Sequence, residues 1–365
     1  MPFTVAVLGA GAGGAATAAD LAARDYRVRL WTRSEQTIAP YRAANSVAFR
    51  GVLGDGEVGV ACATTDLGHA LEGADVAVVS MPSTGHEHVA RALAAAAPPP
   101  LVLNPGQTGS ALRFRAIFAE EHAALPPLAE LSTLAYVARL HTPGCVTVSG
   151  VARCVRAACL PNGEEALDVA RELFPAADPV SDVLATALAN VNLVLHPPGA
   201  ILGASWVEAT GGAFRFYVDG TTAGVARVMA ALDEERLAAA RAFGHELPPL
   251  ADEMASIGTA DVGAAARGDL RGAIVNGEAN REIRAPDSLE HRYYREDFGF
   301  GVVPFLALAD AGGVTAPVAE ALLRIASTLL GVDLGEAGLN AERLGIAGLD
   351  REALRMSVQR AEASR

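Results

Sequence analysis

A glycine-rich turn near the amino terminus constrains the fold of this chain more than any other sequence feature. A short apolar run leads into a G-x-G-x-x-G pattern formed by Gly9, Gly11 and Gly14, and an alanine-rich helical segment follows. Gly9 permits a tight turn, Gly11 lets a pyrophosphate approach the backbone, and Gly14 lets the helix pack closely on the strand. The helix, expected from about Gly14 to Arg24, directs its positive end toward the phosphates, and Ala12 in the turn is a further cofactor-binding candidate. A glycine turn without a ligand would not need this flanking strand and helix, so the sequence predicts dinucleotide binding here.

Short apolar runs recur through the first hundred residues, with helical segments between them. They are Phe3–Leu8, Arg27–Trp31, Asp75–Ser80 and Leu101–Asn104. Continuous Val/Leu runs separated by helices are typical of a parallel sheet that is covered on both faces. We therefore predict an α/β domain in which a doubly wound sheet of Rossmann type carries the glycine turn.

Further strands are expected around this sheet. The turn Gly54–Gly56 separates two strand-like runs and indicates a hairpin. Three later runs are expected to extend the same sheet as antiparallel strands: Leu131–Leu140, Cys145–Val151 and Cys154–Leu160.

The second half of the chain has a helical pattern. It follows a segment with two prolines and two acidic residues, 174–182, and its apolar residues recur at three-to-four spacing. The predicted helices are Leu184–Leu195, Gly224–Phe243, Leu247–Ile257, Val302–Ala311 and Thr315–Leu330. A chain of 365 residues is long enough for two domains. We predict a dinucleotide-binding domain at residues 1–180 and an all-helical substrate domain at residues 181–365.

Composition excludes several classes of function. The chain has no lysine, so all 29 basic residues are arginine, and 42 acidic residues give a formal charge of −13. The absence of an ε-amine excludes Schiff-base enzymes and Walker-type phosphate loops. The acidic balance argues against nucleic acid or a membrane surface as a partner.

Targeting and metal-binding signals are also missing from the sequence. Its apolar stretches are shorter than the roughly 18 residues that a membrane helix needs, and the amino terminus lacks the pattern of a signal peptide. The four cysteines have no metal-ligand spacing. We therefore expect a cytoplasmic protein without a metal site.

The end of the second strand bears on the choice of cofactor. An acidic residue at this place, about 20 residues beyond the glycines, would bind the ribose of NAD, but here the sequence is Thr32, Arg33, Ser34. An arginine flanked by two hydroxyl groups suits a 2′-phosphate, which favours NADP over the alternative, NAD. The competing interpretation is that Arg33 stacks on the adenine or faces water while Glu35 reaches the ribose.

Two further loops follow strands of the predicted sheet, Ser80–Thr84 and Asn104–Gln107. Ligands of open α/β sheets lie at the carboxyl ends of strands. Pro82 and its neighbours are therefore candidates to line the ribose and nicotinamide, although proline and glycine are also common in any turn.

A histidine in the helical half is a candidate acid–base residue. Asn192 and His196 are four residues apart and share one helix face, and Pro197 is expected to end or kink the helix. A histidine at a broken helix end can project into a cleft, whereas a lone helical histidine is more often part of the core or a cap.

A segment rich in Arg, Tyr and Asp, residues 291–304, runs into what is expected to be a glycine-rich loop. Arg292 could bind a carboxylate with its planar guanidinium, and Asp297 could orient a histidine. On the residues alone, a surface cluster of ion pairs explains the segment equally well.

The second half resembles the helical domain of the octopine/nopaline (opine) dehydrogenase family. The matching stretches are Asn190–Pro198, Gly212–Gly220, Leu232–Leu237 and Arg292–Pro304. With the glycine turn and the Ala129–Thr133 strand, the likeness covers nearly the whole chain. It departs from the usual family pattern at Thr32-Arg33, where an acid is more usual, and at Phe298–Phe300.

The resemblance implies roles for individual residues. It assigns catalysis to His196 with Asp297 as its partner, and binding of the substrate carboxylate to Arg292. Glu130 matches a family position near the amine substrate, and Asn192 shares the helix face of His196. The implied architecture is a Rossmann-type cofactor domain followed by an all-helical domain.

The resemblance also implies a reaction. Members of the family reduce the imine formed between an α-keto acid and an amino acid or amine. The alternatives are an NADP-dependent reductase of a preformed imine or keto acid, and a non-catalytic NADP(H)-binding sensor. Related two-domain enzymes that act on glycerol 3-phosphate, 6-phosphogluconate or ketopantoate rely on lysine, which this chain lacks. The apolar helices could also bury a homodimer interface.

Overall fold

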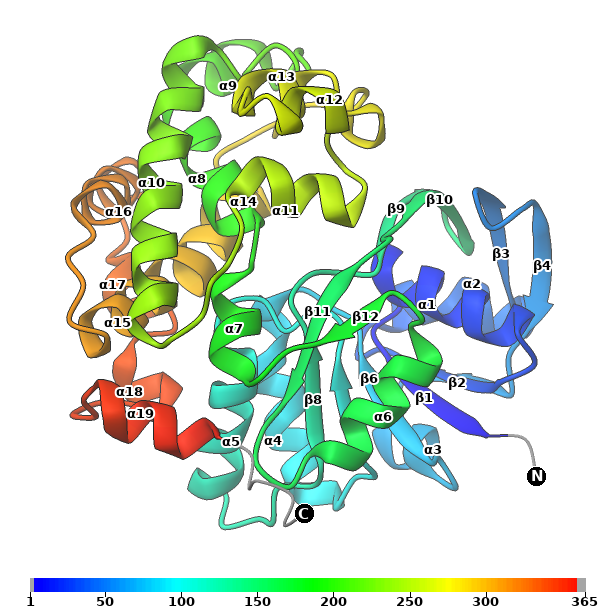
Figure 1. Cartoon of the computed structure of the whole chain (residues 1–365). Helices are drawn as coiled ribbons and strands as arrows, with labels where there is room; N and C mark the ends of the chain where they lie inside the picture. Colours follow the sequence, from blue (N-terminus) through cyan, green and yellow to red (C-terminus); the bar gives the residue numbers. More distant parts are fainter. Residues whose placement is uncertain (1–2, 360–365) are drawn as a thin grey trace. The chain divides into compact units, whose positions relative to one another are not determined.

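In the computed structural model, residues 3–359 are described, and they divide into two compact units (Figure 1). The first unit comprises residues 3–106 and Ser110–Val183, and the second comprises Gln107–Gly109 and Leu184–Gln359. The first is the predicted α/β domain and the second is helical, so the predicted fold class is confirmed.

An eight-stranded sheet forms the core of the first unit, in the order β12-β11-β8-β7-β6-β1-β2-β5. Its strands are β1 Thr4–Leu8, β2 Arg27–Trp31, β5 Cys62–Thr64, β6 Val76–Val79, β7 Leu101–Leu103, β8 Leu128–Leu131, β11 Val155–Cys159 and β12 Ala177–Pro179. All neighbours pair in parallel except β8 and β11. Chain order reverses at β1, which lies between β2 and β6, and such a switch point is where ligands of open sheets bind.

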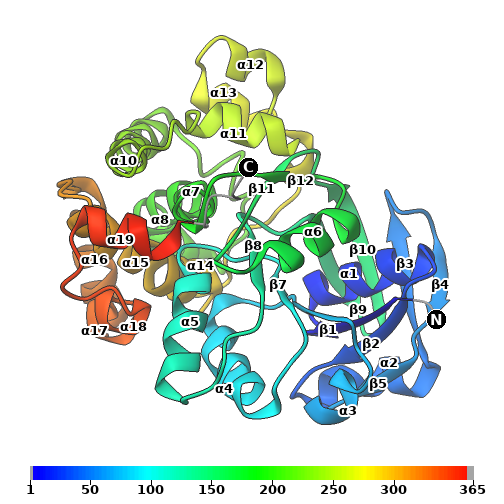
Figure 2. The ribbon, with the colours of Figure 1, turned by 60° about the horizontal axis from the view of Figure 1, so that its bottom comes forward.

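Helices of the first unit connect the parallel strands. They are α1 Ala12–Ala23, α2 Glu35–Ala44, α3 Leu67–Leu71, α4 His86–Ala96, α5 Ser110–Glu120 and α6 Glu164–Leu173. Helices α4 and α5 run side by side, as Figure 2 shows. Every residue of β1, β6 and β7 is buried, because helices cover both faces of this part of the sheet.

Of the strands predicted to extend the main sheet, only one does so, and the others form a second sheet. The hairpin around Gly54–Gly56 is present as β3 Ser46–Gly51 and β4 Gly56–Gly59, but it belongs to a separate four-stranded sheet. Strands β9 Tyr136–Thr142 and β10 Cys145–Val151 complete that sheet, and only β11 joins the main sheet antiparallel. The second sheet depends on a parallel pairing of β10 with β3, and so distant a pairing leaves no local sequence pattern.

The second unit is built from helices. They are α7 Val183–Leu188, α8 Asn192–Leu202, α9 Ala204–Thr210, α10 Ala223–Ala242, α11 Leu250–Ile257, α12 Val262–Ala266, α13 Leu270–Val275, α14 Arg292–Asp297, α15 Val303–Ala311, α16 Pro317–Leu330, α17 Leu334–Ala337, α18 Ala341–Leu344 and α19 Arg351–Val358. Helices α10 and α16 lie side by side (Figure 1).

The predicted helix Leu184–Leu195 is two helices, α7 and α8. Asn190 lies between them, and its side-chain oxygen accepts a 3.1 Å hydrogen bond from the backbone amide of Asn192. Pro197 was predicted to end or kink the helix just after His196. The helix does not end there, because α8 continues through both prolines to Leu202. Helices α10 and α14 pack against α8, and this packing compensates for the hydrogen bonds that proline removes.

A buried ion pair fixes the centre of the helical unit. The Nε of Arg236 donates to Asp233 at 2.7 Å, and its two terminal nitrogens donate to the carbonyl oxygens of Leu188 and Pro248, each at 2.9 Å. Asp233 also accepts from the backbone amide of Leu250 at 2.7 Å. One arginine on α10 thereby ties the end of α7 to the start of α11.

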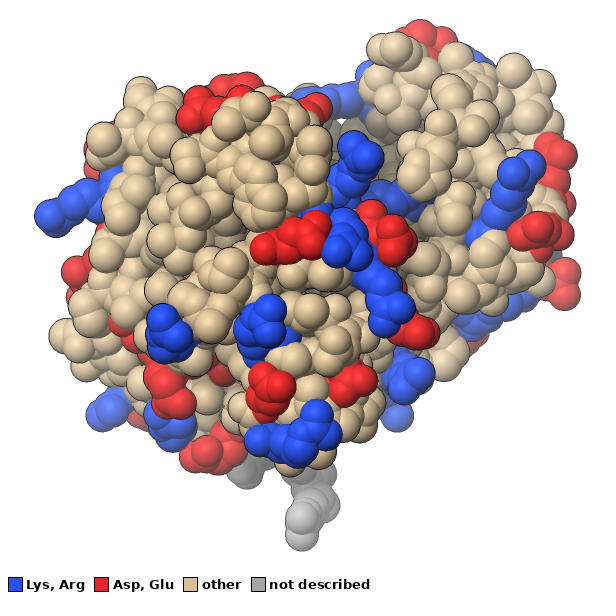
Figure 3. Space-filling view, turned by 90° about the horizontal axis from the view of Figure 1, so that it is seen from above, with Lys and Arg blue, Asp and Glu red and all other residues tan. Residues whose placement is uncertain are grey.

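Acidic and basic side chains are both present on the face shown in Figure 3, often beside one another. Across residues 3–359, none of the helices combines the length and the apolar character that a membrane span requires.

Candidate active site

The side chains of His196 and Asp297 are 101 residues apart in sequence and meet inside the second unit. His196 Nδ1 lies 2.8 Å from Asp297 Oδ2, and the two residues are 1% and 3% exposed. An ionised carboxylate only accepts hydrogen bonds, so Nδ1 carries a proton. The other ring nitrogen, Nε2, is therefore the atom that can exchange a proton.

A π-helical turn positions Asp297. Asp297 is the last residue of α14, and residues Phe298–Val302 continue as π-helix directly into α15. The expected glycine-rich loop is therefore wrong, because its two glycines lie within continuous helical structure. Single π-helical turns are frequent at functional sites, since the wider turn changes the direction of neighbouring side chains.

Aromatic side chains enclose the His196 ring. The ring of Tyr293 stacks on it at a centroid distance of 3.8 Å and an interplanar angle of 22°, and Phe216 meets it edge-on at 6.0 Å. The Tyr217 hydroxyl lies 2.8 Å from His196 Nε2 and 3.5 Å from the Tyr293 hydroxyl.

The sequence interpretation gave none of these three aromatic residues a role, although Phe216, Tyr217 and Tyr293 lie in stretches that carry the family resemblance. The signal that could have identified Phe216 and Tyr217 is the cluster of three aromatic residues in the four-residue segment Phe214–Tyr217. Such a density is unusual in a chain with only 5% aromatic residues.

Arg292 begins α14 and lies on the same helix as Asp297. Its side chain is 43% exposed, and one terminal nitrogen lies 3.5 Å from the buried carboxylate of Glu296. The guanidinium therefore has surface available to a ligand while Glu296 restrains it. A surface cluster of ion pairs does not describe this segment, because Glu296 and Asp297 are both buried.

His291 precedes Arg292 and stays neutral at physiological pH. Burial, together with the positive charges of Arg292 and His196, lowers the pKa of His291 to about 4. Its Nδ1 accepts a 3.3 Å hydrogen bond from the backbone amide of Tyr293 at the start of α14. His291 therefore caps the helix and does not compete with His196 for a proton.

The two other predicted substrate residues are placed differently. Asn192 is the first residue of α8, one turn before His196, and its side-chain amide is partly exposed with no hydrogen bond to the described residues. Glu130 belongs to the first unit and has no exposed surface. Its carboxylate accepts a 3.1 Å hydrogen bond from the backbone amide of Ala111 near the start of α5.

The glycine turn has the shape that a pyrophosphate requires. Gly9 has a φ of +127°, and a Cβ at Gly14 would lie 1.8 Å from the carbonyl oxygen of Gly9. A Cβ at Gly11 would meet nothing within 4 Å, so the backbone faces open space there. Helix α1 has neither a side-chain cap nor an acidic residue in its first turn. Its amino terminus, which begins at Ala12, therefore suits an anion.

The residues after β2 offer a free cation beside two hydroxyl groups. Arg33 is exposed and makes no hydrogen bond or ion pair with residues 3–359. Ser34 caps α2 by accepting from the amide of Thr37, and Thr32 accepts from the amide of Ser34. Glu35 is bound in a close ion pair with Arg42. After β6, the exposed Pro82 precedes a short 3-10 turn at Ser83–Gly85.

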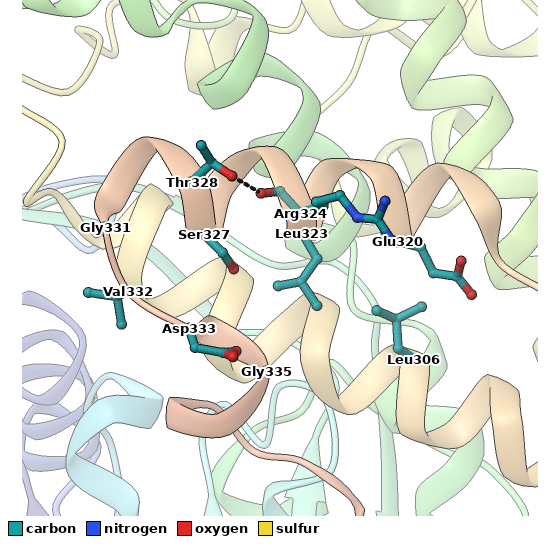
Figure 4. Close-up of a pocket in the computed structure, with 10 residues that line it drawn as sticks. All are labelled: Leu306, Glu320, Leu323, Arg324, Ser327, Thr328, Gly331, Val332, Asp333 and Gly335. Carbon is teal, nitrogen blue, oxygen red and sulfur yellow. Dashed lines mark hydrogen bonds between the residues drawn. The ribbon is translucent and has the colours of Figure 1, made fainter.

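A groove in the helical unit lies elsewhere. It has a volume of about 610 Å³ and is lined by residues of α15, α16 and the start of α17 (Figure 4). Polar side chains such as Glu320, Arg324 and Asp333 line it, and none of the predicted site residues is among them. The groove therefore carries no argument for catalysis.

Two family models match this chain. Residues 179–330 match the model described as "NAD/NADP octopine/nopaline dehydrogenase, alpha-helical domain". Residues 4–104 match the model described as "NAD-dependent glycerol-3-phosphate dehydrogenase N-terminus".

Individual relatives match over most of the length. An opine dehydrogenase of Arthrobacter sp. (strain 1C) is 33% identical over 361 residues, which cover 98% of this chain and 99% of that protein. The protein ocs of Agrobacterium vitis is 27% identical over 79% of this chain and 80% of its own length.

Solved structures share the fold. Octopine dehydrogenase in complex with NADH and agmatine superposes with a TM-score of 0.77 at 22% identity, over 99% of this chain and 100% of that one. Yersinopine dehydrogenase with bound NADP+ superposes with a TM-score of 0.72 at 17% identity, over 98% and 97% of the two chains.

Proposed function

This chain belongs to the octopine/nopaline dehydrogenase family and is an NAD(P)-dependent oxidoreductase acting on CH–NH bonds. We propose that it condenses an α-keto acid with an amino acid or a related amine. The imine that forms between them is reduced to a secondary amine. Relatives of the same fold have been solved with agmatine, with L-arginine and with pyruvate, which supports these two substrate classes.

The observation that carries the proposal is the buried pair of His196 and Asp297. The carboxylate 2.8 Å from Nδ1 stabilises the charged imidazole, so Nε2–H can act as a general acid. In the condensation, Nε2 gives its proton to the hydroxyl group of the carbinolamine, which leaves as water. The C=N bond forms at the same carbon, and His196 becomes neutral.

Arg292 is proposed to bind the keto acid carboxylate. A guanidinium presents two parallel N–H groups to a carboxylate, and Glu296 holds that of Arg292 from one side. We also assign Asn192 to substrate binding, because its amide is partly exposed one turn before His196 on α8. An amine contact by Glu130 remains a prediction, and it would require exposure of a carboxylate that is now buried.

We propose NADP(H) as the cofactor. The open space over Gly11 would receive the pyrophosphate, and Arg33 would pair with the 2′-phosphate beside Thr32 and Ser34. The ion pair with Arg42 engages Glu35, which weakens the competing interpretation that Glu35 binds the ribose. When bound, the nicotinamide supplies the hydride that reduces the imine carbon.

NADPH oxidation by the purified protein tests the proposed reaction. A keto acid such as pyruvate is added alone, a panel of amino acids and amines is added alone, and every pair is then tried. We expect turnover only with pairs, together with a product of the mass of the secondary amine. Turnover with one partner alone would instead indicate a simple reductase, and tight NADPH binding without any turnover would indicate a sensor.

A further inference from the structure

The hydroxyl group of Tyr217 is hydrogen-bonded to Nε2 of His196, the nitrogen that exchanges a proton. It lies 2.8 Å from Nε2, while Asp297 takes the opposite nitrogen at the same distance. His196, Asp297 and Tyr217 are 1%, 3% and 5% exposed. Both ring nitrogens of a buried imidazole are therefore hydrogen-bonded within the protein.

The backbone on both sides of Tyr217 is held by hydrogen bonds. The amide of Phe216 donates to the carbonyl oxygen of Ile283 at 2.9 Å, and the amide of Asp219 donates to that of Arg215 at 2.9 Å. A Cβ at Gly220 would lie 2.4 Å from the carbonyl oxygen of Phe216, so the turn after Tyr217 is closely packed.

A phenol can serve both protonation states of the ring. It donates to Nε2 when His196 is neutral, and its oxygen accepts from Nε2–H when His196 is charged. The second bond is charge-assisted and about twice as strong as the first. A charged N–H without an acceptor also costs more in a buried site than a neutral nitrogen without a donor. The Tyr217 hydroxyl therefore favours the charged ring.

We propose that Tyr217 is a positioning residue of this site, whose hydroxyl keeps buried His196 protonated at Nε2 until a substrate oxygen takes the proton. When the N–H bond breaks and an O–H bond forms on the leaving water, the electron pair stays on Nε2. The hydroxyl then turns to donate to that pair. This last step rests on the proposed function, whereas the effect on the protonation of His196 does not.

Charged groups also lie on the helices that pack around His196. Asp297 bonds the ring and Tyr293 stacks on it from α14, and His291, directly before α14, interacts with it electrostatically. Arg292 on the same helix lies near the buried carboxylate of Glu296. The buried charges on α10, Asp233 and Arg236, pair with each other. Charged residues of the other packed helices are exposed: Glu208 on α9, and Glu320 and Arg324 on α16.

The test compares Tyr217→Phe with Tyr294→Phe. The Tyr294→Phe variant also loses one buried hydrogen bond, which the Tyr294 hydroxyl donates to the carbonyl oxygen of Ala200 at 3.0 Å. That hydroxyl does not bond His196. Proteins labelled with ¹⁵N-histidine are titrated by NMR, and the signals of His196 are identified with His196→Asn. In Tyr217→Phe the midpoint of His196 protonation should fall by about one pH unit, a tenfold change, and in Tyr294→Phe it should stay at the wild-type value.

An unchanged or higher midpoint in folded Tyr217→Phe would overturn the proposal. If that variant does not fold, 3-fluorotyrosine at position 217 keeps the ring and weakens the oxygen as an acceptor. The midpoint should then fall by a smaller amount, and no fall would again overturn the proposal. Because the titration needs no substrate, it decides the inference even if no substrate pair turns over. If a pair does turn over, the basic limb of the kcat profile should move with the NMR midpoint.

Discussion

The backbone amide of Leu339 donates a 2.7 Å hydrogen bond to the carbonyl oxygen of Gly299. Gly299 lies in the π-helical turn that directly follows Asp297. The bond therefore ties the segment after α17 to the turn that positions the carboxylate partner of His196. The preceding glycine, Gly338, is packed so closely on this turn that a Cβ would lie 2.6 Å from the same oxygen.

Gly338→Ala should displace the π-helical turn and lower kcat, because the new methyl group would overlap the carbonyl oxygen of Gly299. Forced overpacking of this kind costs about 1–3 kcal/mol of stability. The matched control is Gly301→Ala in the same turn, where a Cβ would meet nothing within 4 Å. Steady-state kinetics and thermal unfolding measure both effects. Equal kcat values for the two variants would show that the contact does not position Asp297.

His196→Asn should lower kcat by about 10²- to 10⁴-fold, the usual contribution of a general acid, while NADPH binding stays intact. Fluorescence titration with NADPH gives the binding constant, and the exposed His88 on α4 offers the control His88→Asn. Full activity in His196→Asn would remove His196 from the mechanism.

Arg33→Ala should weaken binding of NADPH more than of NADH, because only NADPH carries the 2′-phosphate. Loss of one charge-assisted contact corresponds to about 2 kcal/mol, or roughly 30-fold in affinity. Arg27→Ala removes an exposed arginine from the amino end of β2 and should leave the preference unchanged. Calorimetric titration with each cofactor makes the comparison, and an unaltered preference in Arg33→Ala would contradict the NADP assignment.

Patterns within short stretches of sequence predicted most strands of the main sheet and several helices. The strands β1, β2, β6 and β7 were recognisable as continuous apolar runs, and several helices were recognisable because their apolar residues recur with the period of a helix. The second sheet was missed as a separate element, because the pairing of Cys145 with Ala48 joins segments almost a hundred residues apart. The course of α8 through Pro197 depends on packing against α10 and α14, which no residue of α8 reveals.

The candidate site could be predicted only in part for a similar reason. His196 and Asp297 came from a family resemblance, since nothing local connects two residues 101 positions apart. Tyr217 is positioned by the turn in which it lies, and Tyr293 is positioned by α14. The burial of Glu296 and Asp297 likewise depends on tertiary packing, because the sequence of α14 alone suggests an exposed charged helix.

Asp233→Asn should destabilise the helical unit, because the substitution leaves the charge of Arg236 buried without its counter-ion. Breaking one partner of a buried ion pair costs about 3–5 kcal/mol. Asp252→Asn removes an exposed carboxylate on the neighbouring α11 and serves as the control. Urea unfolding of both variants gives the difference, and equal stability would mean that hydrogen bonds to the neutral amide are sufficient.

Stability in acid should depend on His86, which lies at the start of α4 and is 3% exposed. Its ring contacts the Ser110 hydroxyl at 3.0 Å and the carbonyl oxygen of Met81 at 3.2 Å. Burial lowers the pKa of His86 from 6.5 to about 4, against an opposing effect of the Met81 carbonyl. Between these two values the unfolded chain binds the proton and the folded chain does not.

The free energy of unfolding should therefore keep its full contribution from neutral His86 above about pH 6.5 and should lose it as the pH drops toward 4. Between about pH 7 and pH 5 the loss from this one histidine amounts to about 2 kcal/mol. His86→Gln removes the titrating group, so its stability should decline less over the same interval, even if it is lower at pH 7. His88→Gln on the exposed face of α4 should retain the wild-type decline. Urea unfolding at the two pH values measures the slopes, and parallel slopes for wild type and His86→Gln would show that His86 does not govern acid stability.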